Sequence, residues 1–162
     1  MKVLVFNQQK DLSLSAISAK AVVKEVLASE KVETDEVAVY FVTAPEICRL
    51  HAEFFLDPTP TDCISFPIDG IQLQHGAYHV LGEIFICPHS ALDYLMAQSE
   101  DLNDDVYTET TLYLVHGLLH LIGYDDIEEN DRLKMRTAEQ KHMAHLLSKD
   151  LLLKSTTLTR RR

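Results

Sequence analysis

The chain has 162 residues and a formal net charge of −10, with 46% hydrophobic and 25% charged residues. This length predicts one domain that buries roughly 70% of the surface exposed by the unfolded chain, and the composition is typical of a globular protein. The negative charge argues against non-specific coating of nucleic acid, which depends on lysine and arginine. No apolar run is long enough to span a bilayer, and no secretory signal opens the chain. We therefore expect a cytoplasmic protein without membrane contact.

Four segments have the alternating, β-branched composition of strands. The segments at residues 2–6 and 37–43 are each followed by a helical pattern, whereas those at 61–66 and 78–87 follow one another and are expected to pair.

Five segments carry apolar residues at helical spacing. They are residues 13–29, 44–56, 89–100, 108–122 and 127–152, and in the last one Met135, Ala138, Leu146 and Leu147 are expected on one side. The segment at 108–122 is apolar on nearly every side, so we place it at the centre of the fold. Gly123 follows it, where a helix-terminating glycine belongs.

These elements predict an α+β fold with a single domain over residues 1–154, in which a small mixed sheet of about four strands packs with about five helices. Residues 155–162 end in three arginines and are expected to form a flexible basic tail. Cys48, Cys63 and Cys87 show no metal-binding spacing, so we expect them to be small buried residues.

The stretch LYLVHGLLHLIGYDD, residues 112–126, places two histidines four positions apart in an apolar helix. Residues at this spacing lie on one face, so His116 and His120 can direct their rings at one point. Zinc prefers nitrogen ligands and needs at least one more, which Asp125 or Asp126 could supply past the turn at Gly123. The pattern predicts a metal site with an open position for water, whose pKa can fall to about 7. It identifies no side chain as general base.

Other interpretations of these residues stay open. Asp126 stands three residues before Glu129 and could cap the last helix instead. Gly117 replaces the catalytic glutamate of the H-E-x-x-H metalloprotease helix, which disfavours peptidase chemistry. A glycine within a helix usually signals close approach of another group, here expected to be substrate. For His142 and His145 we expect a partly exposed helix face.

HGLLHLIGYDD, residues 116–126, resembles the signature H-G-x-L-H-L-x-G-Y-D-H of the YbeY family of metal-dependent endoribonucleases, also called ribosomal RNA maturation factors. PTDCISFP at residues 60–67 resembles the family's P-T-D-V-L-S-F-P, and LGEIFIC at 81–87 resembles its L-G-D-I-x-I-S strand. The order and spacing of these motifs agree over nearly the whole chain.

The resemblance implies that His116 and His120 are ligands of one Zn²⁺ and that Asp126 stands where the family has its third ligand, a histidine. A carboxylate is also an accepted zinc ligand. The family further places an arginine, thought to serve the phosphate, in a pattern like L-N-x-x-Y-R. Aligned on Leu50, that position is Phe55 in this chain, which leaves Arg49 as the basic residue to consider for the site.

The resemblance implies a single-strand-specific endoribonuclease that acts in 3′-end maturation of 16S ribosomal RNA and in ribosome quality control. Because an acidic protein attracts basic partners, we expect docking on the small ribosomal subunit through basic ribosomal proteins, and no dedicated small-molecule substrate. The alternatives are a non-catalytic ribosome-assembly factor with a structural metal, which Phe55 and Asp126 favour, and a zinc peptidase-like hydrolase.

Overall fold

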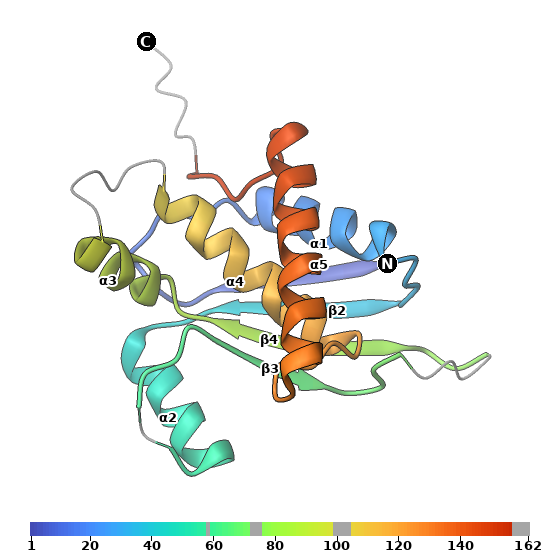
Figure 1. Ribbon diagram of the computed structural model, residues 1–162, viewed down its shortest axis with the longest axis horizontal. Helices are drawn as coiled ribbons and strands as arrows, with labels where there is room; N and C mark the ends of the chain where they lie inside the picture. Colours follow the sequence, from blue (N-terminus) through green and yellow to red (C-terminus); the bar gives the residue numbers. More distant parts are fainter. Residues whose placement is uncertain (58, 72–75, 99–104, 157–162) are drawn as a thin grey trace.

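The structure is a computed structural model that describes residues 1–57, 59–71, 76–98 and 105–156 (Figure 1). Within these residues four strands and five helices are arranged in one α+β unit, as the sequence predicts. In chain order they are β1 (Lys2–Asn7), α1 (Ala16–Ser29), β2 (Glu36–Phe41), α2 (Ala44–Phe55), β3 (Cys63–Pro67), β4 (Val80–Ile86), α3 (Pro88–Gln98), α4 (Asp105–Leu121) and α5 (Glu129–Ser148).

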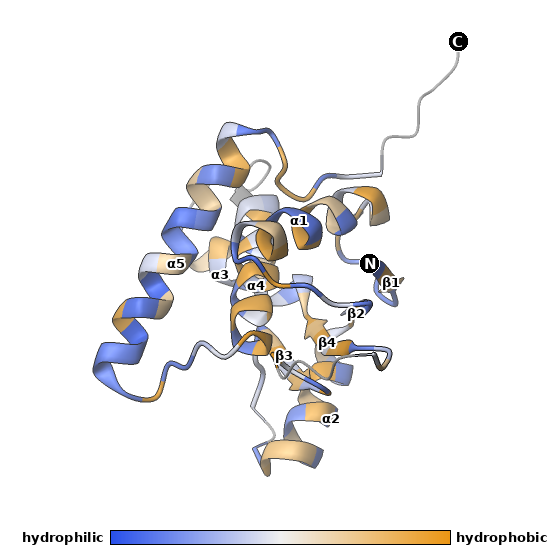
Figure 2. Cartoon of the chain, turned by 90° about the vertical axis from the view of Figure 1, so that its right-hand side faces the viewer, coloured by the Kyte–Doolittle hydropathy of each residue, from blue (hydrophilic) through white to orange (hydrophobic). Residues whose placement is uncertain are grey.

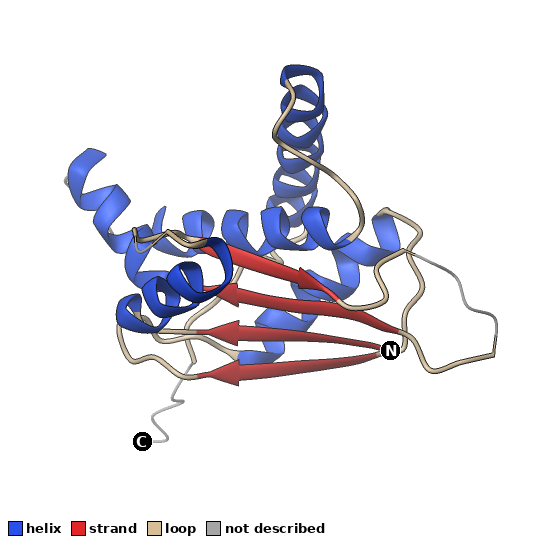
Figure 3. Ribbon diagram, turned by 90° about the horizontal axis from the view of Figure 1, so that it is seen from below, coloured by secondary structure: helices blue, strands red, loops and turns tan. Residues whose placement is uncertain are grey.

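The four strands form one mixed sheet in the order β1-β2-β4-β3 (Figure 3). β1 pairs with β2 and β2 pairs with β4 in parallel, whereas β3 and β4 run antiparallel. The helices α1 and α2 lie in the connections between the parallel strands, as such connections require. The predicted pairing of the third and fourth strands is confirmed.

The helices lie unevenly on the two faces of the sheet. α1 contacts β1, and α4 contacts β3 and β4 as well as α1, α3 and α5. α2 contacts β3 and lies on the opposite side of the sheet, toward one end (Figure 2). In the same view hydrophobic residues follow the strands and α4, whereas α5 is largely hydrophilic. Helix α4 is therefore the central helix of the core.

Helix α4 is held by burial and ends in a defined turn. Leu114, Leu118 and Leu119 are fully buried, and each such leucine contributes about 1.5–3 kcal/mol relative to an exposed one. Past its end, Gly123 has a φ of +105°, its N–H donates to the His120 carbonyl at 3.1 Å, and the Tyr124 N–H donates to the Leu119 carbonyl at 3.0 Å. This is a Schellman turn, which confirms the expected role of Gly123.

Several predicted helix limits were wrong. α1 begins at Ala16 because Ser15 is its N-cap, with a side chain that accepts from the Ser18 N–H. α4 begins earlier than expected, at Asp105. α5 ends at Ser148 rather than near residue 152, because the chain reverses at Asp150, whose φ is +54°.

Two predictions for side chains of α5 were also wrong. Leu147 is 66% exposed instead of packing beside Met135 and Leu146. His142, expected on a partly exposed face, is 2% exposed as a side chain and lies 2.5 Å from the Glu30 carboxylate. His142 therefore shares the buried stripe of α5 and links it to α1, whereas His145 is partly exposed and pairs with Glu25 at 2.7 Å.

The C-terminal tail is described only in part. The Thr156 hydroxyl donates to the Leu14 carbonyl at 3.0 Å, and Ser155 is hydrogen-bonded to Ser13 at 3.0 Å. The arginines expected to make this tail basic lie outside the described residues. None of the described helices combines the length and apolar character that a membrane crossing needs. Cys87 is buried and Cys48 and Cys63 are half-buried, all as free thiols.

Candidate metal centre

The two histidines of α4 converge as the spacing predicts. The Nε2 atoms of His116 and His120 lie 3.0 Å apart, and the two rings meet edge to face at 82°. Their side chains are 29% and 28% exposed, so both rings reach the surface of the fold. The last turns of α4 thus present two nitrogen donors at one point.

Asp126 joins the histidines after the Schellman turn. Its Oδ2 lies 3.6 Å from the His116 Nε2 and 3.4 Å from the His120 Nε2. Asp126 does not cap α5, because the N-cap residue is Glu128, which makes no side-chain cap hydrogen bond. The capping interpretation of Asp126 was therefore wrong, and the structure brings together the three side chains named from the sequence. We call His116, His120 and Asp126 the metal triad.

Hydrogen bonds on the far side of each ring fix its orientation. The His116 Nδ1–H donates to the Glu139 carboxylate at 2.6 Å, and the His120 Nδ1–H donates to the Tyr124 carbonyl at 3.1 Å. Both partners only accept, so each neutral ring keeps its proton on Nδ1 and its lone pair on Nε2. Two lone pairs and a carboxylate oxygen then face one another, an arrangement that a cation between them stabilises.

The spacing of the three donors matches that of ligand atoms around a small tetrahedral ion. Ligand atoms about 2.0–2.1 Å from a tetrahedral ion lie about 3.3 Å from one another, and the three donors of the triad are separated by 3.0, 3.4 and 3.6 Å. Among the described residues the triad forms a group of His and acidic side chains close enough to hold an ion. The donors fit a metal ion bound by three ligands.

The electrostatic surroundings also favour positive charge at the triad. Burial opposes protonation of His116, but the hydrogen bond to Glu139 and the negative charges of Glu139, Asp62 and Asp126 outweigh it and raise the pKa of this histidine. A site that draws in a proton in this way attracts a metal cation by the same charges.

Gly117 contacts the sheet, not substrate. A Cβ on this residue would lie 2.6 Å from the Ile84 Cγ2 and 2.8 Å from the Cys63 Sγ, and the backbone carbonyl of Gly117 accepts a hydrogen bond from the Ser65 hydroxyl at 2.9 Å. The prediction that this glycine leaves room for substrate was wrong. It lets α4 approach β3 and β4 closely enough to place the histidines at the edge of the sheet.

A cleft of about 580 Å³ opens over the triad. Its lining combines the triad with the last turn of α2 and with β3 and the segment before it: His51, Phe55, Thr61, Asp62, Cys63, Ile64, Ser65 and Pro67. Phe55, which the sequence resemblance aligns with an arginine of the family, therefore lies at the site. Arg49 is not among the lining residues, and its guanidinium is bound to Glu46 and Glu53, each at 2.7 Å.

Two acidic residues of the site were not assigned from the sequence. Asp62 belongs to the PTD motif, and the walls of the cleft desolvate its carboxyl and raise its pKa. Glu139 could have been found from its position in the sequence, because it lies next to the buried stripe of α5 formed by Met135, Ala138 and His142. An acidic residue at the border of a buried stripe can reach a partner on the neighbouring helix. Cys63 also lines the cleft, but burial raises the pKa of its thiol and keeps it protonated.

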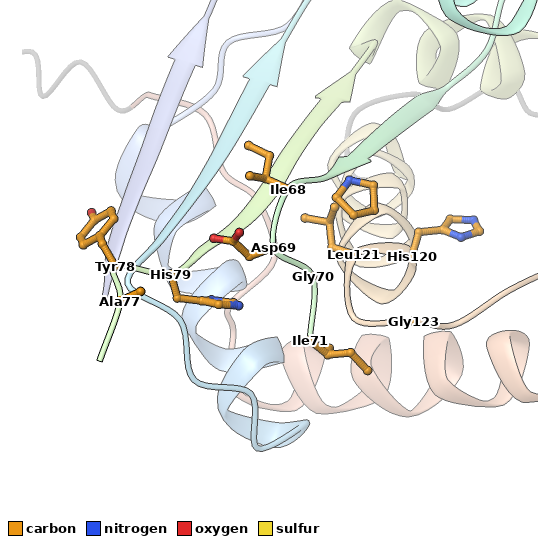
Figure 4. Close-up of a pocket in the computed structure, with 11 residues that line it drawn as sticks. Ile68, Asp69, Gly70, Ile71, Ala77, Tyr78, His79, His120, Leu121 and Gly123 are labelled. Atoms are coloured by element: carbon orange, nitrogen blue, oxygen red, sulfur yellow. The ribbon is translucent and has the colours of Figure 1, made fainter. Parts of the chain in front are cut away.

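A second cleft, of about 420 Å³, adjoins the first and shares His120 and Pro67 with it. Figure 4 shows this second cleft between the segment after β3, with Asp69 and Ile71, and the segment before β4, with Tyr78 and His79. The His120 ring points away from Asp69 and His79 in this view. All three residues of the metal triad thus line the first cleft, whereas the second cleft is lined by His120 alone of the three.

Fold and site together define the class of this protein: a small α+β domain whose central helix presents two histidines, joined by a carboxylate, to an open cleft. The sequence model of the family described as Endoribonuclease YbeY matches residues 4–147. The chain is 53% identical over 148 residues to the Endoribonuclease YbeY of Protochlamydia amoebophila, covering 91% of this chain and 95% of the relative. It is 41% identical over 153 residues to that of Chlamydia felis, covering 94% and 96%.

The solved structures agree on the fold. The solution structure of TM1509 from Thermotoga maritima superimposes with a TM-score of 0.59, at 21% identity, and covers 99% of this chain and 100% of that one. From the family match and the identities to its members, the chain belongs to the YbeY family of endoribonucleases.

Proposed function

We propose that this protein is a metal-dependent endoribonuclease that cleaves single-stranded RNA. The observation that carries the proposal is the convergence of three donors within 3.6 Å of one another in the lining of an open cleft. Membership of an endoribonuclease family supplies the reaction class, and the cleft supplies access for a strand. The biological substrate that we propose is ribosomal RNA, in 3′-end maturation of the 16S molecule and in ribosome quality control.

The metal triad would hold one ion, for which we propose Zn²⁺. When bound, this ion would supply Lewis-acid activation of water and of a phosphoryl oxygen. Glu139 and the Tyr124 carbonyl hold the two rings with Nε2 toward the cleft. Asp126 comes from an exposed turn and its side chain is 43% exposed, so it closes the triad from the solvent side.

Asp62 is the residue that we assign to proton transfer. Its side chain lines the same cleft as the triad, and desolvation raises the pKa of its carboxyl. A carboxyl with a raised pKa exchanges protons closer to neutral pH than an ordinary aspartate. The Asp62 carboxylate can therefore accept a proton from the attacking water or return one to the leaving oxygen.

We further propose that charge brings the protein to its substrate. A chain of net charge −10 is repelled by bulk RNA and attracted to basic ribosomal proteins on the small subunit. Binding to purified small subunits should therefore weaken as salt is added. Binding that is unaffected by salt would contradict this part of the proposal.

A ribosome-assembly factor with a purely structural metal is the second candidate, because Phe55 replaces a phosphate-binding arginine at the cleft. The two proposals differ when a chelator is added. An open catalytic site predicts a metal-free protein that stays folded and loses activity, whereas a structural metal predicts unfolding.

The proposed function is tested by incubating the protein with an unpaired RNA, the same RNA annealed to its complement, and an unfolded protein substrate. We expect cleavage of the unpaired RNA alone, abolished by chelator and restored by added Zn²⁺. Cleavage of the unfolded protein, or of RNA with equal speed in chelator, would contradict the proposal. Asp62→Asn should slow cleavage while metal content stays unchanged.

A further inference from the structure

An exposed aromatic side chain stands at the mouth of the cleft. Phe55 is the last residue of α2, its side chain lines the cleft of the metal triad, and it is 54% exposed. Large aromatic residues contribute most when buried, so the exposed part of Phe55 is available to a ligand. Because Phe55 and the triad line the same cleft, a substrate bound at the triad can contact this ring.

Neighbouring rings hold Phe55 in place. The Phe66 ring lies nearly parallel to it, at 28° and 6.3 Å between centroids, and the His51 ring lies 5.6 Å away on the same helix. The His51 Nδ1–H donates to the Thr59 carbonyl at 2.8 Å, which fixes that ring in turn. The chain reverses directly after Phe55, since Leu56 is left-handed with a φ of +57°. The exposed Phe55 ring is therefore held in place by its contacts with His51 and Phe66.

No described side chain that lines this cleft carries a permanent positive charge. Among the described residues that line it there is no lysine or arginine, while Asp62 and Asp126 carry negative charge. Arg49, the nearest candidate from the sequence, is occupied by Glu46 and Glu53. Apart from the ion proposed for the triad, the phosphates of a nucleic acid find no cationic partner in the described lining, so contacts to its bases must supply further affinity.

We propose that Phe55, supported by His51 and Phe66, is a stacking surface for an unpaired nucleobase next to the scissile phosphate. This inference rests on the proposed endoribonuclease function and names what its substrate must offer: an unstacked base. Stacking on an aromatic side chain is the common way in which proteins bind single strands, and it tolerates any base because each has a π-face. A paired base is stacked in its duplex and is not available to Phe55.

The test compares two oligomers of equal length whose phosphorothioate linkages slow hydrolysis by an attacking water: a single-stranded oligoribonucleotide and an abasic version of the same backbone. Wild-type protein should bind the base-bearing oligomer more tightly. Phe55→Ala should weaken that binding by roughly 5- to 150-fold and leave the affinity for the abasic oligomer nearly unchanged. A preference for bases that survives in Phe55→Ala would overturn the inference.

Matched variants separate stacking from other effects. Phe54→Ala is the control, because Phe54 is 56% exposed on the same helix but packs edge-on against Phe66 and does not line the cleft. It should bind both oligomers like the wild type. Phe55→Tyr should keep the preference for bases, whereas Phe55→Leu should lose it although it keeps an apolar side chain. Equal loss in Phe54→Ala and Phe55→Ala would contradict a role specific to Phe55.

Failure of the inference and failure of the proposed function give different results. Cleavage of RNA that is independent of Phe55, with an unchanged preference for bases, would remove the inference alone. Binding that depends on bases and on Phe55, in a protein that cleaves no RNA, would remove the proposed nuclease activity and support the stacking site.

Discussion

The base of the cleft and its mouth differ in how firmly the fold holds their side chains. At the base, His116 and His120 project from a buried helix and are each fixed by a second hydrogen bond. At the mouth, Phe55 and Asp126 come from a helix end and a turn, and their side chains are about half exposed. The two histidines are thus held in fixed geometry, whereas Asp126, the third donor, and Phe55 come from positions that the fold holds less firmly.

Two positions of the site, Asp126 and Phe55, are those at which the sequence resemblance implies a histidine and an arginine in the family. Both positions lie where side chains are about half exposed. A substitution at an exposed turn disturbs few contacts, whereas one in α4 would disturb the core. A change at Asp126 or Phe55 is therefore expected to disturb the fold less than a change at either histidine.

Glu139→Gln should have the largest effect among the predictions for residues around the triad. The variant keeps an acceptor near the His116 Nδ1 but removes the negative charge 2.6 Å away. Loss of a partner behind a metal ligand typically costs about 10- to 100-fold in metal affinity or activity. Competition with a zinc chelator measures the affinity. Glu129→Gln makes the same charge change on an exposed part of α5 and should leave the metal affinity unchanged. Equal losses of metal affinity in the two variants would contradict the claim that Glu139 positions His116 for the metal.

Gly117→Ala should destabilise the fold. The added Cβ would lie 2.6 Å from Ile84 and 2.8 Å from Cys63, and overpacking of this kind costs about 1–3 kcal/mol, offset by about 1 kcal/mol from the better helix propensity of alanine. Urea denaturation should therefore show a lower free energy of unfolding, by about 1 kcal/mol. If Gly117→Ala were as stable as the wild type, α4 would not be held against the sheet as tightly as the contacts indicate.

Arg49→Ala should have the smallest effect. Its ion pairs with Glu46 and Glu53 are exposed, and solvent screens such pairs so that they contribute little to stability. Its affinity for single-stranded RNA, measured by fluorescence anisotropy, should equal that of the wild type because Arg49 does not line the cleft. A marked loss of affinity would show that this arginine leaves its partners for the phosphate and that charge acts at the mouth after all.

Local patterns were enough to predict the order of the elements and the pairing of the two histidines. Helical spacing fixes which residues share a face, so the convergence of His116 and His120 follows from the sequence, and Gly123 ends the helix through its own backbone conformation. The approach of α4 to the sheet at Gly117 did not follow, because the contact with Ile84 joins residues far apart in the chain. A glycine within a helix predicts that another group lies close by, but not whether that group is the sheet or a substrate.

Partners that come from distant elements were missed for the same reason. Glu139 and the buried His142 lie on one helix whose polar residues look solvent-exposed by composition. Only the packing of α5 on α4 and α1 turns His142 toward Glu30 and Glu139 toward His116. At Asp126 the error was of another kind, because the local sequence has the pattern of a helix cap. In the structure Asp126 does not cap α5, and its side chain lies beside His116 and His120.

The central claim is that three side chains hold one metal ion on which RNA cleavage depends. It is tested most directly by measuring bound metal and RNA cleavage on the same samples of wild type, His116→Ala, Asp126→Ala and Asp126→His. We predict one bound ion and RNA cleavage in the wild type, and loss of both in His116→Ala and Asp126→Ala. Asp126→His should bind the ion again, unlike Asp126→Ala, because it supplies a ligand nitrogen at the same position. Full metal content and full activity in Asp126→Ala would contradict the account.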